Sequence, residues 1–97
     1  MTATTRSSEG LDPRRRKLLF LSWRRGIREM DLIMGCFANE EIETLAGQEL
    51  DDFERLTEVP DHDLLAWVTG ERQTPAEYDT VVFRRMRDFH WRGNDRG

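Results

Sequence analysis

Few residues of this 97-residue chain are of the types that perform covalent or metal chemistry, and they do not cluster. The single cysteine, Cys36, falls within a helical pattern, and both histidines, His62 and His90, are distant from it in sequence. A cysteine in that setting is most often a small buried side chain. Metal binding needs several Cys or His residues at ligand spacing, and the carboxylates of residues 40–63 lack the regular positions of a calcium loop. We therefore expect a binding protein and not an enzyme, with no metal.

One stretch, residues 23–31, places many hydrogen-bonding groups around a glycine. The polar residues beside Gly26 are Arg24, Arg25, Arg28, Glu29 and Asp31. On a structural interpretation, Gly26 turns the chain and the two acids lie near the positive end of the following helix. On a functional interpretation, glycine lets a partner's surface approach the backbone, and Arg25 and Glu29 offer it oriented hydrogen bonds. The residues by themselves leave both interpretations open.

Helices are predicted on both sides of this stretch. Asp12-Pro13 is typical of a helix start and predicts a first helix that runs to about Arg24. Its inward side chains are expected to be Leu18, Leu19 and Trp23. After a turn at Arg25-Gly26, apolar residues at three- and four-residue steps predict a second helix over residues 27–43. Gly35 weakens that helix by about 1 kcal/mol relative to Ala, unless it permits the close approach of another helix.

Three further helices are predicted in the second half of the chain. Leu50, Phe53 and Leu56 share one face of a third helix over residues 47–58. Asp61 is expected to cap a fourth helix, which ends at Gly70. A capping box, Thr74-Pro75-Ala76-Glu77, predicts the start of a fifth. No alternating strand pattern is present, so the sequence predicts an all-α protein, a compact five-helix bundle over residues 12–91. Residues 1–11 are expected to be a disordered tail and residues 92–97 a flexible one.

Composition and charge narrow the possible functions. Charged residues make up 35% of the chain and apolar residues 37%, which predicts a thin core under a charged surface. The net charge of −4 argues against a dedicated nucleic-acid binder. No apolar run approaches the roughly 20 residues of a membrane-spanning helix, and the N-terminus lacks the apolar core of a secretory signal. The basic residues 14–28 precede the acidic residues 29–63. Such a dipolar surface could orient a partner, or the charges could be two solvated faces that attract each other within the bundle.

A family resemblance favours the functional interpretation of the glycine. The run Arg25-Gly26-Ile27-Arg28-Glu29 matches the R-G-x-x-E motif of the succinate dehydrogenase assembly factor 2 family, whose bacterial members are called SdhE. Residues 22–33 resemble the family's junction between its first two helices. Residues 63–70, which read D-L-L-A-W-V-T-G, resemble the family's D-L-x-x-W segment. The resemblance extends over roughly residues 12–91, with the segments in the family's order and spacing.

The resemblance implies a fold, a partner and a site. Members of the family fold as five-helix bundles and act on the flavoprotein subunit of succinate dehydrogenase, and in some bacteria on fumarate reductase. That subunit attaches FAD covalently to one of its own histidines; the factor promotes the attachment and binds no FAD stably itself. By position, the contact surface would centre on Arg25, Gly26 and Glu29, with a rim of Trp23, Arg24, Arg28 and Asp31. The free protein would be a monomer, in the bacterial cytoplasm or the mitochondrial matrix.

Two other functions are compatible with the sequence. Arg14, Arg15, Arg16 and Lys17 could present a basic helix to nucleic acid, although the middle of the chain is strongly acidic. A toxin-neutralising partner is a second alternative, because some members of this family have carried that label. Both alternatives are also binding functions, and identification of the co-purifying molecule would separate them.

Overall fold

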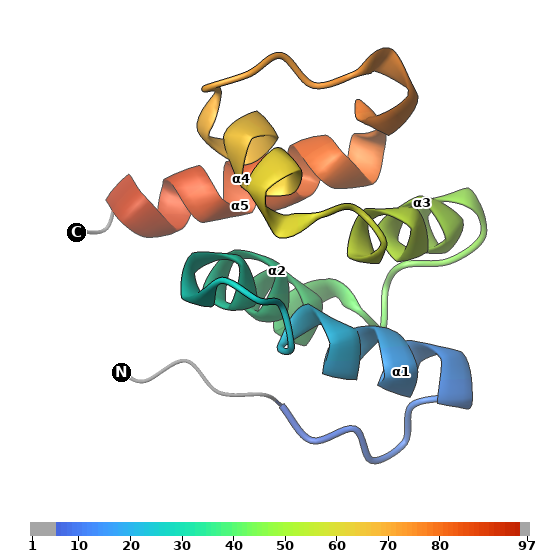
Figure 1. The fold of residues 1–97 in the computed structure, drawn as a ribbon. Helices are drawn as coiled ribbons and strands as arrows, with labels where there is room; N and C mark the ends of the chain where they lie inside the picture. The colour runs from blue at the N-terminus through green and yellow to red at the C-terminus, as the bar shows by residue number, and fades with distance from the viewer. Residues whose placement is uncertain (1–5, 96–97) are drawn as a thin grey trace.

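Helices account for all the regular structure that the computed structural model describes, which covers residues 6–95 and the side chains of residues 6–91 (Figure 1). Their bounds are α1 (Pro13–Ser22), α2 (Arg28–Glu41), α3 (Gln48–Thr57), α4 (Asp61–Thr69), the 3₁₀ turn η1 (Ala76–Tyr78) and α5 (Val81–Asp95). These residues contain no strand. The predicted all-α class and five-helix bundle are therefore confirmed.

Phe37 of α2 lies at the meeting point of three helices. The centroid of its ring is 5.9 Å from the centroids of Phe53 in α3 and Phe89 in α5. Phe37 and Phe53 are fully buried, and burial of each such side chain contributes roughly 1.5–3 kcal/mol. On the other side of α2, Leu18 and Leu19 of α1 complete the core. The core thus holds α1 and α2 as a pair, and the connection between them reaches the surface.

The first helix begins as predicted and ends earlier. The Asp12 carboxylate accepts a hydrogen bond from the Arg15 N–H at 3.2 Å, and Pro13 is the first helical residue. A side-chain hydrogen bond from Arg15 lowers the pKa of Asp12, so this capping carboxylate stays ionised to a lower pH than a free aspartate does. The helix ends at Ser22 because Trp23 and Arg24 donate backbone hydrogen bonds three residues back, a tightened last turn.

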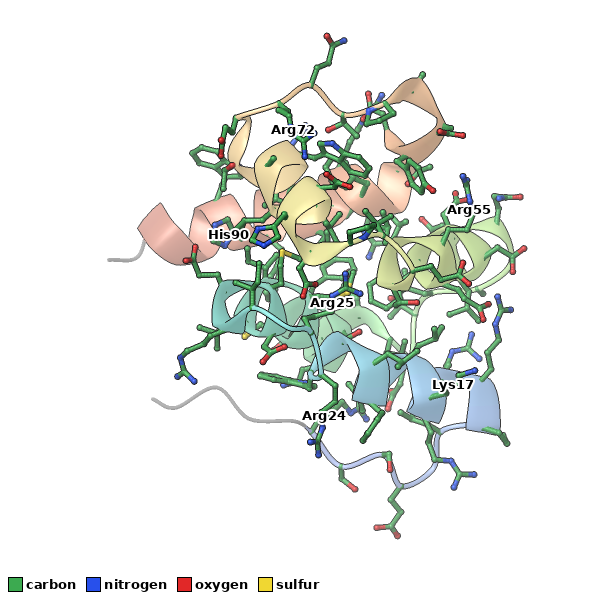
Figure 2. The ribbon with its side chains drawn as sticks, in the orientation of Figure 1. Lys17, Arg24, Arg25, Arg55, Arg72 and His90 are labelled. Atoms are coloured by element: carbon green, nitrogen blue, oxygen red, sulfur yellow. The ribbon has the colours of Figure 1, made fainter. Side chains whose placement is uncertain are left out.

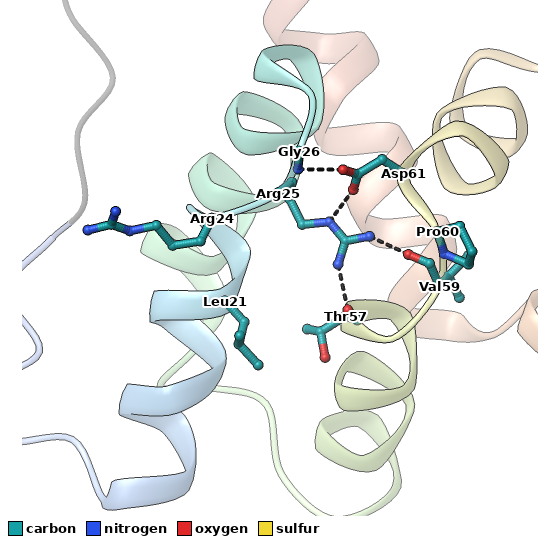
Figure 3. Close-up of a pocket in the computed structure, with 8 residues that line it drawn as sticks. All are labelled: Leu21, Arg24, Arg25, Gly26, Thr57, Val59, Pro60 and Asp61. Carbon is teal, nitrogen blue, oxygen red and sulfur yellow. Dashed lines mark hydrogen bonds and ion pairs between the residues drawn. The ribbon is translucent and has the colours of Figure 1, made fainter.

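The predicted cap of α4 is wrong. Asp61 is the first residue inside the helix, Pro60 precedes it, and no side chain caps the helix N-terminus. The Asp61 carboxylate instead points to the connection between α1 and α2 (Figure 3). The Asp61 carboxylate therefore binds residues distant in the sequence, although the preference of helix N-termini for aspartate predicts that it caps α4. The predicted helix end is confirmed, since Gly70 follows α4 with a positive φ of 81°.

The predicted start of α5 is also wrong. Residues 76–78 form the separate turn η1, which Pro75 precedes without any side-chain cap, and α5 starts only at Val81. Its cap is Thr80, whose hydroxyl accepts the Phe83 N–H at 3.2 Å. The η1 turn places the Tyr78 ring 5.2 Å from the Trp67 ring. The interruption between the apparent capping box and the helix thus coincides with an aromatic contact with α4.

The two candidate caps of α5 can be separated by mutation. Thr80→Ala should lower the free energy of unfolding by about 1 kcal/mol, because it removes the acceptor of an N-terminal helical N–H. Thr74→Ala, the matched control, should change it by less than about 0.5 kcal/mol. Urea denaturation followed by circular dichroism measures both. A larger loss for Thr74→Ala would show that the helix starts at the sequence-predicted position.

The chain ends differ in part from the predicted tails. The Arg6 N–H donates to Asn39 Oδ1 at 3.0 Å, and Leu11 belongs to the core. Part of the segment predicted as disordered thus packs on α2, while residues 1–5 lie outside the described residues. At the other end, α5 continues to Asp95 through residues predicted as a flexible tail, and residues 96–97 lie outside the described part.

Candidate partner-binding site at the helix junction

Residues 23–27, here called the junction, connect α1 to α2 and are fixed by two carboxylates. The backbone N–H of Arg25 donates to Asp31 Oδ1 at 2.6 Å, and the N–H of Gly26 donates to the Asp61 carboxylate. Asp31 lies in the first turn of α2, whereas Asp61 comes from α4 (Figure 3). Two backbone groups that no helix satisfies are thereby paired. The junction therefore has a fixed shape although it contains no regular structure.

The Arg25 side chain points inward and ties the junction to the connection between α3 and α4. Its Nε donates to Asp61 Oδ1 at 2.6 Å, its Nη1 to the Thr57 carbonyl at 2.6 Å, and its Nη2 to the Val59 carbonyl. The side chain is only 7% exposed. Thr57 is the last residue of α3, where carbonyls lack helical partners and a cation is favoured. The Arg25 guanidinium thus forms these hydrogen bonds with acceptors of its own chain.

Gly26 suits this position for a reason that differs from the predicted one. Its φ is not positive, so the turn itself does not need glycine. A Cβ on Gly26 would lie 3.0 Å from Asp61 Oδ2, closer than side chains normally pack. The missing side chain therefore lets the Asp61 carboxylate reach the backbone. The residue remains exposed on its other side, which also suits the functional interpretation.

The Trp23 side chain packs on α2 at a second glycine, Gly35. A Cβ on Gly35 would fall 2.4 Å from Trp23 Cδ2, so the indole lies directly on the helix backbone at that point. The indole N–H also donates to Asn39 Oδ1 at 3.1 Å. The sequence suggested that Gly35 could permit the close approach of another helix. The group that approaches it closely is instead the ring of Trp23. Trp23 thereby fixes one end of the junction.

The seven residues of the predicted site are brought together, in two groups. Trp23, Arg25 and Asp31 are half-buried and make the internal contacts described above. Arg24, Gly26, Arg28 and Glu29 are exposed. Neither Arg28 nor Glu29 forms an ion pair with another described residue, and Figure 3 shows Arg24 pointing away from the Arg25 guanidinium. The exposed group, here called the junction surface, is the part that a partner can touch.

Sequence reasoning missed Asp61 and the two carbonyls that hold Arg25. Asp61 was assigned to a helix cap, and no local signal relates it to Arg25, which is 36 residues away. Together with Leu21 and Pro60, these groups line an open pocket of about 210 Å³ next to the junction surface. A pocket of this size and openness suits the side chain of a partner protein better than a cofactor, which fills a deep cleft of about 300–1,000 Å³.

The described residues offer little for catalysis. They contain no group of three or more His, Cys, Asp or Glu side chains that could hold a metal ion. Burial, together with nearby Glu40, raises the pKa of the Cys36 thiol, so the nucleophilic thiolate is scarce at neutral pH. Across the same residues, none of the helices has the length and apolar content needed to cross a bilayer. The junction itself presents a shaped, charged surface.

Comparison with known proteins decides the family. A family model described as the flavinator of succinate dehydrogenase matches residues 16–90, which include the junction and α4. The chain belongs to this family. The FAD assembly factor SdhE of Acetobacter pasteurianus is 36% identical over 80 residues, which are 82% of this chain and 73% of that protein. The resemblance inferred from the R-G-x-x-E and D-L-x-x-W segments is confirmed.

Mitochondrial members of the flavinator family are similar over the same region. Succinate dehydrogenase assembly factor 2 of Mycosarcoma maydis is 35% identical over 80% of this chain and 33% of its own length. The corresponding protein of Dictyostelium discoideum is 37% identical over 72% of this chain and 50% of its own length. The chain therefore spans half or less of these two mitochondrial relatives. Family members thus occur both in bacteria and in mitochondria.

Proposed function

We propose that this protein binds the flavoprotein subunit of succinate dehydrogenase and promotes the covalent attachment of FAD to it. The description of the family and the name of the Acetobacter relative support this proposal. The observation that carries it is the exposed junction surface, which contains Gly26, Arg28 and Glu29 of the R-G-x-x-E motif. The protein performs no bond-making step, holds no FAD stably and is a monomer when free. It works in the bacterial cytoplasm or, in a eukaryote, in the mitochondrial matrix.

The proposed contact follows the two groups of site residues. Gly26 and Glu29 form its centre, because they are exposed and lie one turn apart where the junction enters α2. Arg24 and Arg28 form an exposed cationic rim. Arg25 acts mainly from inside, by fixing the backbone of Gly26, and Trp23 and Asp31 hold the two ends of the junction. Such pre-organisation reduces the entropy that binding would otherwise cost.

Binding without chemistry is sufficient to promote flavin attachment. The reaction needs the flavin and the acceptor histidine in near-attack geometry, with developing negative charge stabilised by groups of the flavoprotein itself. A factor that binds the competent conformer of the flavoprotein more tightly than other conformers raises its population. Tenfold tighter binding of that conformer corresponds to about 1.4 kcal/mol. The junction surface needs no catalytic residue to have this effect.

The test uses Glu29, which makes no ion pair with another described residue. Glu29→Ala should weaken binding of the flavoprotein subunit about five- to thirtyfold, because a central interface anchor is removed. The yield of covalent flavin in cells should fall in parallel. Binding is measured by titration with purified FAD-free subunit, and covalent flavin by fluorescence of the denatured subunit in a gel.

Glu71→Ala is the matched control, since Glu71 is an exposed glutamate in the segment after α4. It should leave binding and flavin yield unchanged. Both variants should keep the helical circular dichroism of the wild type, because neither residue is part of the core. Unchanged binding by Glu29→Ala would remove the junction surface from the proposed function.

A further inference from the structure

The outer side of α1 carries an exposed aromatic ring with an arginine on it. Phe20 is 55% exposed, although a phenylalanine on a helix of a small bundle is normally buried. The Arg24 guanidinium lies over the Phe20 ring, 4.9 Å from its centroid. This cation–π contact holds both side chains in place at the surface. Aromatic and arginine side chains are the types that anchor protein interfaces.

Cationic residues surround this ring without acidic partners. Arg16 and Lys17 are exposed and lie four and three residues before Phe20, respectively, on the same side of the helix. No described carboxylate forms an ion pair with Arg16, Lys17 or Arg24. Figure 2 shows Lys17 and Arg24 on the outside of the bundle. These four residues, Arg16, Lys17, Phe20 and Arg24, are here called the basic–aromatic face.

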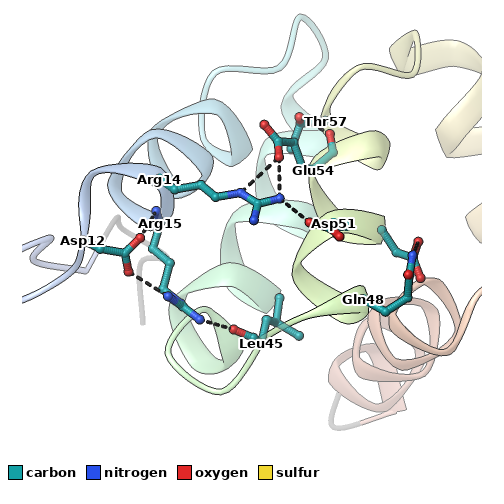
Figure 4. Close-up of polar contacts among 9 residues, drawn as sticks. Asp12, Arg14, Arg15, Leu45, Gln48, Asp51, Glu54 and Thr57 are labelled. Atoms are coloured by element: carbon teal, nitrogen blue, oxygen red, sulfur yellow. Dashed lines mark hydrogen bonds and ion pairs between the residues drawn. The ribbon is translucent and has the colours of Figure 1, made fainter.

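The other basic residues of α1 have internal partners. Arg14 donates to Asp51 at 2.7 Å and to Glu54 at 2.6 Å, both on α3 (Figure 4). Arg15 pairs with Asp12 at 2.7 Å and donates to the Ile42 carbonyl at 3.0 Å. Two of the four basic residues 14–17, which suggested nucleic-acid binding, are therefore engaged in contacts within the bundle. The charges left over are the ones next to Phe20.

The basic–aromatic face is continuous with the junction surface. Arg24 belongs to both, and Leu21 and Arg24 line the pocket beside Gly26 (Figure 3). A partner that covers the junction surface therefore meets the end of α1 without crossing any other element. The chain as a whole has a net charge of −4, so this face is a local reversal of its overall sign. Its cations attract carboxylates, whereas the acidic residues of α2 and α3 oppose the approach of a uniformly charged polyanion.

We propose that the basic–aromatic face is a second contact with the same flavoprotein subunit, and that it binds a segment in which carboxylates flank an apolar side chain. The inference rests on the proposed function and extends it beyond the R-G-x-x-E motif. Arg16 and Lys17 attract the carboxylates during approach, which raises the association rate. Phe20, with Arg24 on its ring, takes the apolar side chain, which slows dissociation.

The experiment measures association and dissociation of the FAD-free flavoprotein subunit by biolayer interferometry at 50 and 300 mM NaCl. The double variant Arg16→Glu/Lys17→Glu should associate about tenfold more slowly at 50 mM NaCl and should lose most of the salt dependence. Phe20→Ala should dissociate about tenfold faster with little change in association. The matched control, Arg72→Glu/Arg84→Glu, makes the same change in net charge at exposed arginines after α4 and on α5. It should bind as the wild type does.

Separate outcomes distinguish this inference from the proposed function. If the wild type binds and Glu29→Ala weakens binding, but the Arg16/Lys17 and Phe20 variants bind as the wild type does, the second contact is refuted and the proposed function stands. No binding by the wild type would overturn both. Salt-sensitive retention of the wild type on DNA that the double charge variant loses, with unchanged flavoprotein binding, would assign the face to nucleic acid instead.

Discussion

Asp61→Ala is expected to lower the free energy of unfolding by about 3 kcal/mol. The change leaves the Arg25 guanidinium, which is 7% exposed, without its counter-charge, and leaves the Gly26 N–H without its acceptor. Removal of one partner of a buried ion pair typically costs about 3–5 kcal/mol. The lower value applies because the Asp61 side chain is 16% exposed at an open pocket, so water can replace part of the lost interaction. Urea denaturation measures the change.

Asp63→Ala is the control for this prediction. Asp63 lies two residues further along α4 and pairs with Arg72 at 2.5 Å on the surface, where its loss should cost less than about 1 kcal/mol. Adding Arg25→Met to Asp61→Ala should recover part of the lost stability, because the uncompensated charge is then gone. Equal stability of the Asp61 and Asp63 variants would mean that the two carbonyls satisfy Arg25 unaided.

Gly35→Ala is expected to destabilise the protein by about 2 kcal/mol, against the usual preference of helices. Alanine in a helix interior is favoured over glycine by about 1 kcal/mol. Here the new methyl group would lie 2.4 Å from the Trp23 indole, and overpacking typically costs about 1–3 kcal/mol. Because this contact is so short, we expect a cost near the upper end of that range, which exceeds the propensity gain by about 2 kcal/mol. Thermal or urea denaturation gives the sign directly.

A double-mutant cycle assigns the effect to the tryptophan. In a Trp23→Ala background the space over Gly35 is open, so Gly35→Ala should become neutral or stabilising. Displacement of the indole should also disturb the junction, because Trp23 is its first residue. Stabilisation by Gly35→Ala in the wild-type background would show that the indole does not lie on the α2 backbone.

Most of the helices could be predicted from the sequence because their signals are local. The apolar period of α2 and α3, the Asp12-Pro13 start of α1 and the glycine that ends α4 each depend on residues within a few positions. The start of α5 could not be predicted in that way. The sequence places the start at Thr74-Pro75, whereas α5 begins after Thr80, and Tyr78 of the intervening turn contacts Trp67 on α4.

The candidate site divides in the same way. The location of the junction was predictable, because a glycine among arginines and acids between two helical patterns marks a connection between two helices. The contacts that its individual residues make could not be predicted from the sequence. Trp23 and Asp31, predicted as rim residues, are held by Gly35 and by the Arg25 backbone, and no periodicity indicates such contacts.

The sequence by itself determined the five helices, the family and the location of the junction, since each depends on neighbouring residues or on a short motif. The tertiary structure decided which of two adjacent arginines faces inward. Arg24 and Arg25 have the same side chain and nearly the same neighbours, yet the Arg25 side chain is only 7% exposed and Arg24 lies on Phe20. The choice is made by Asp61 and by the carbonyls at the end of α3, which reach Arg25 only when α3 and α4 pack beside the junction.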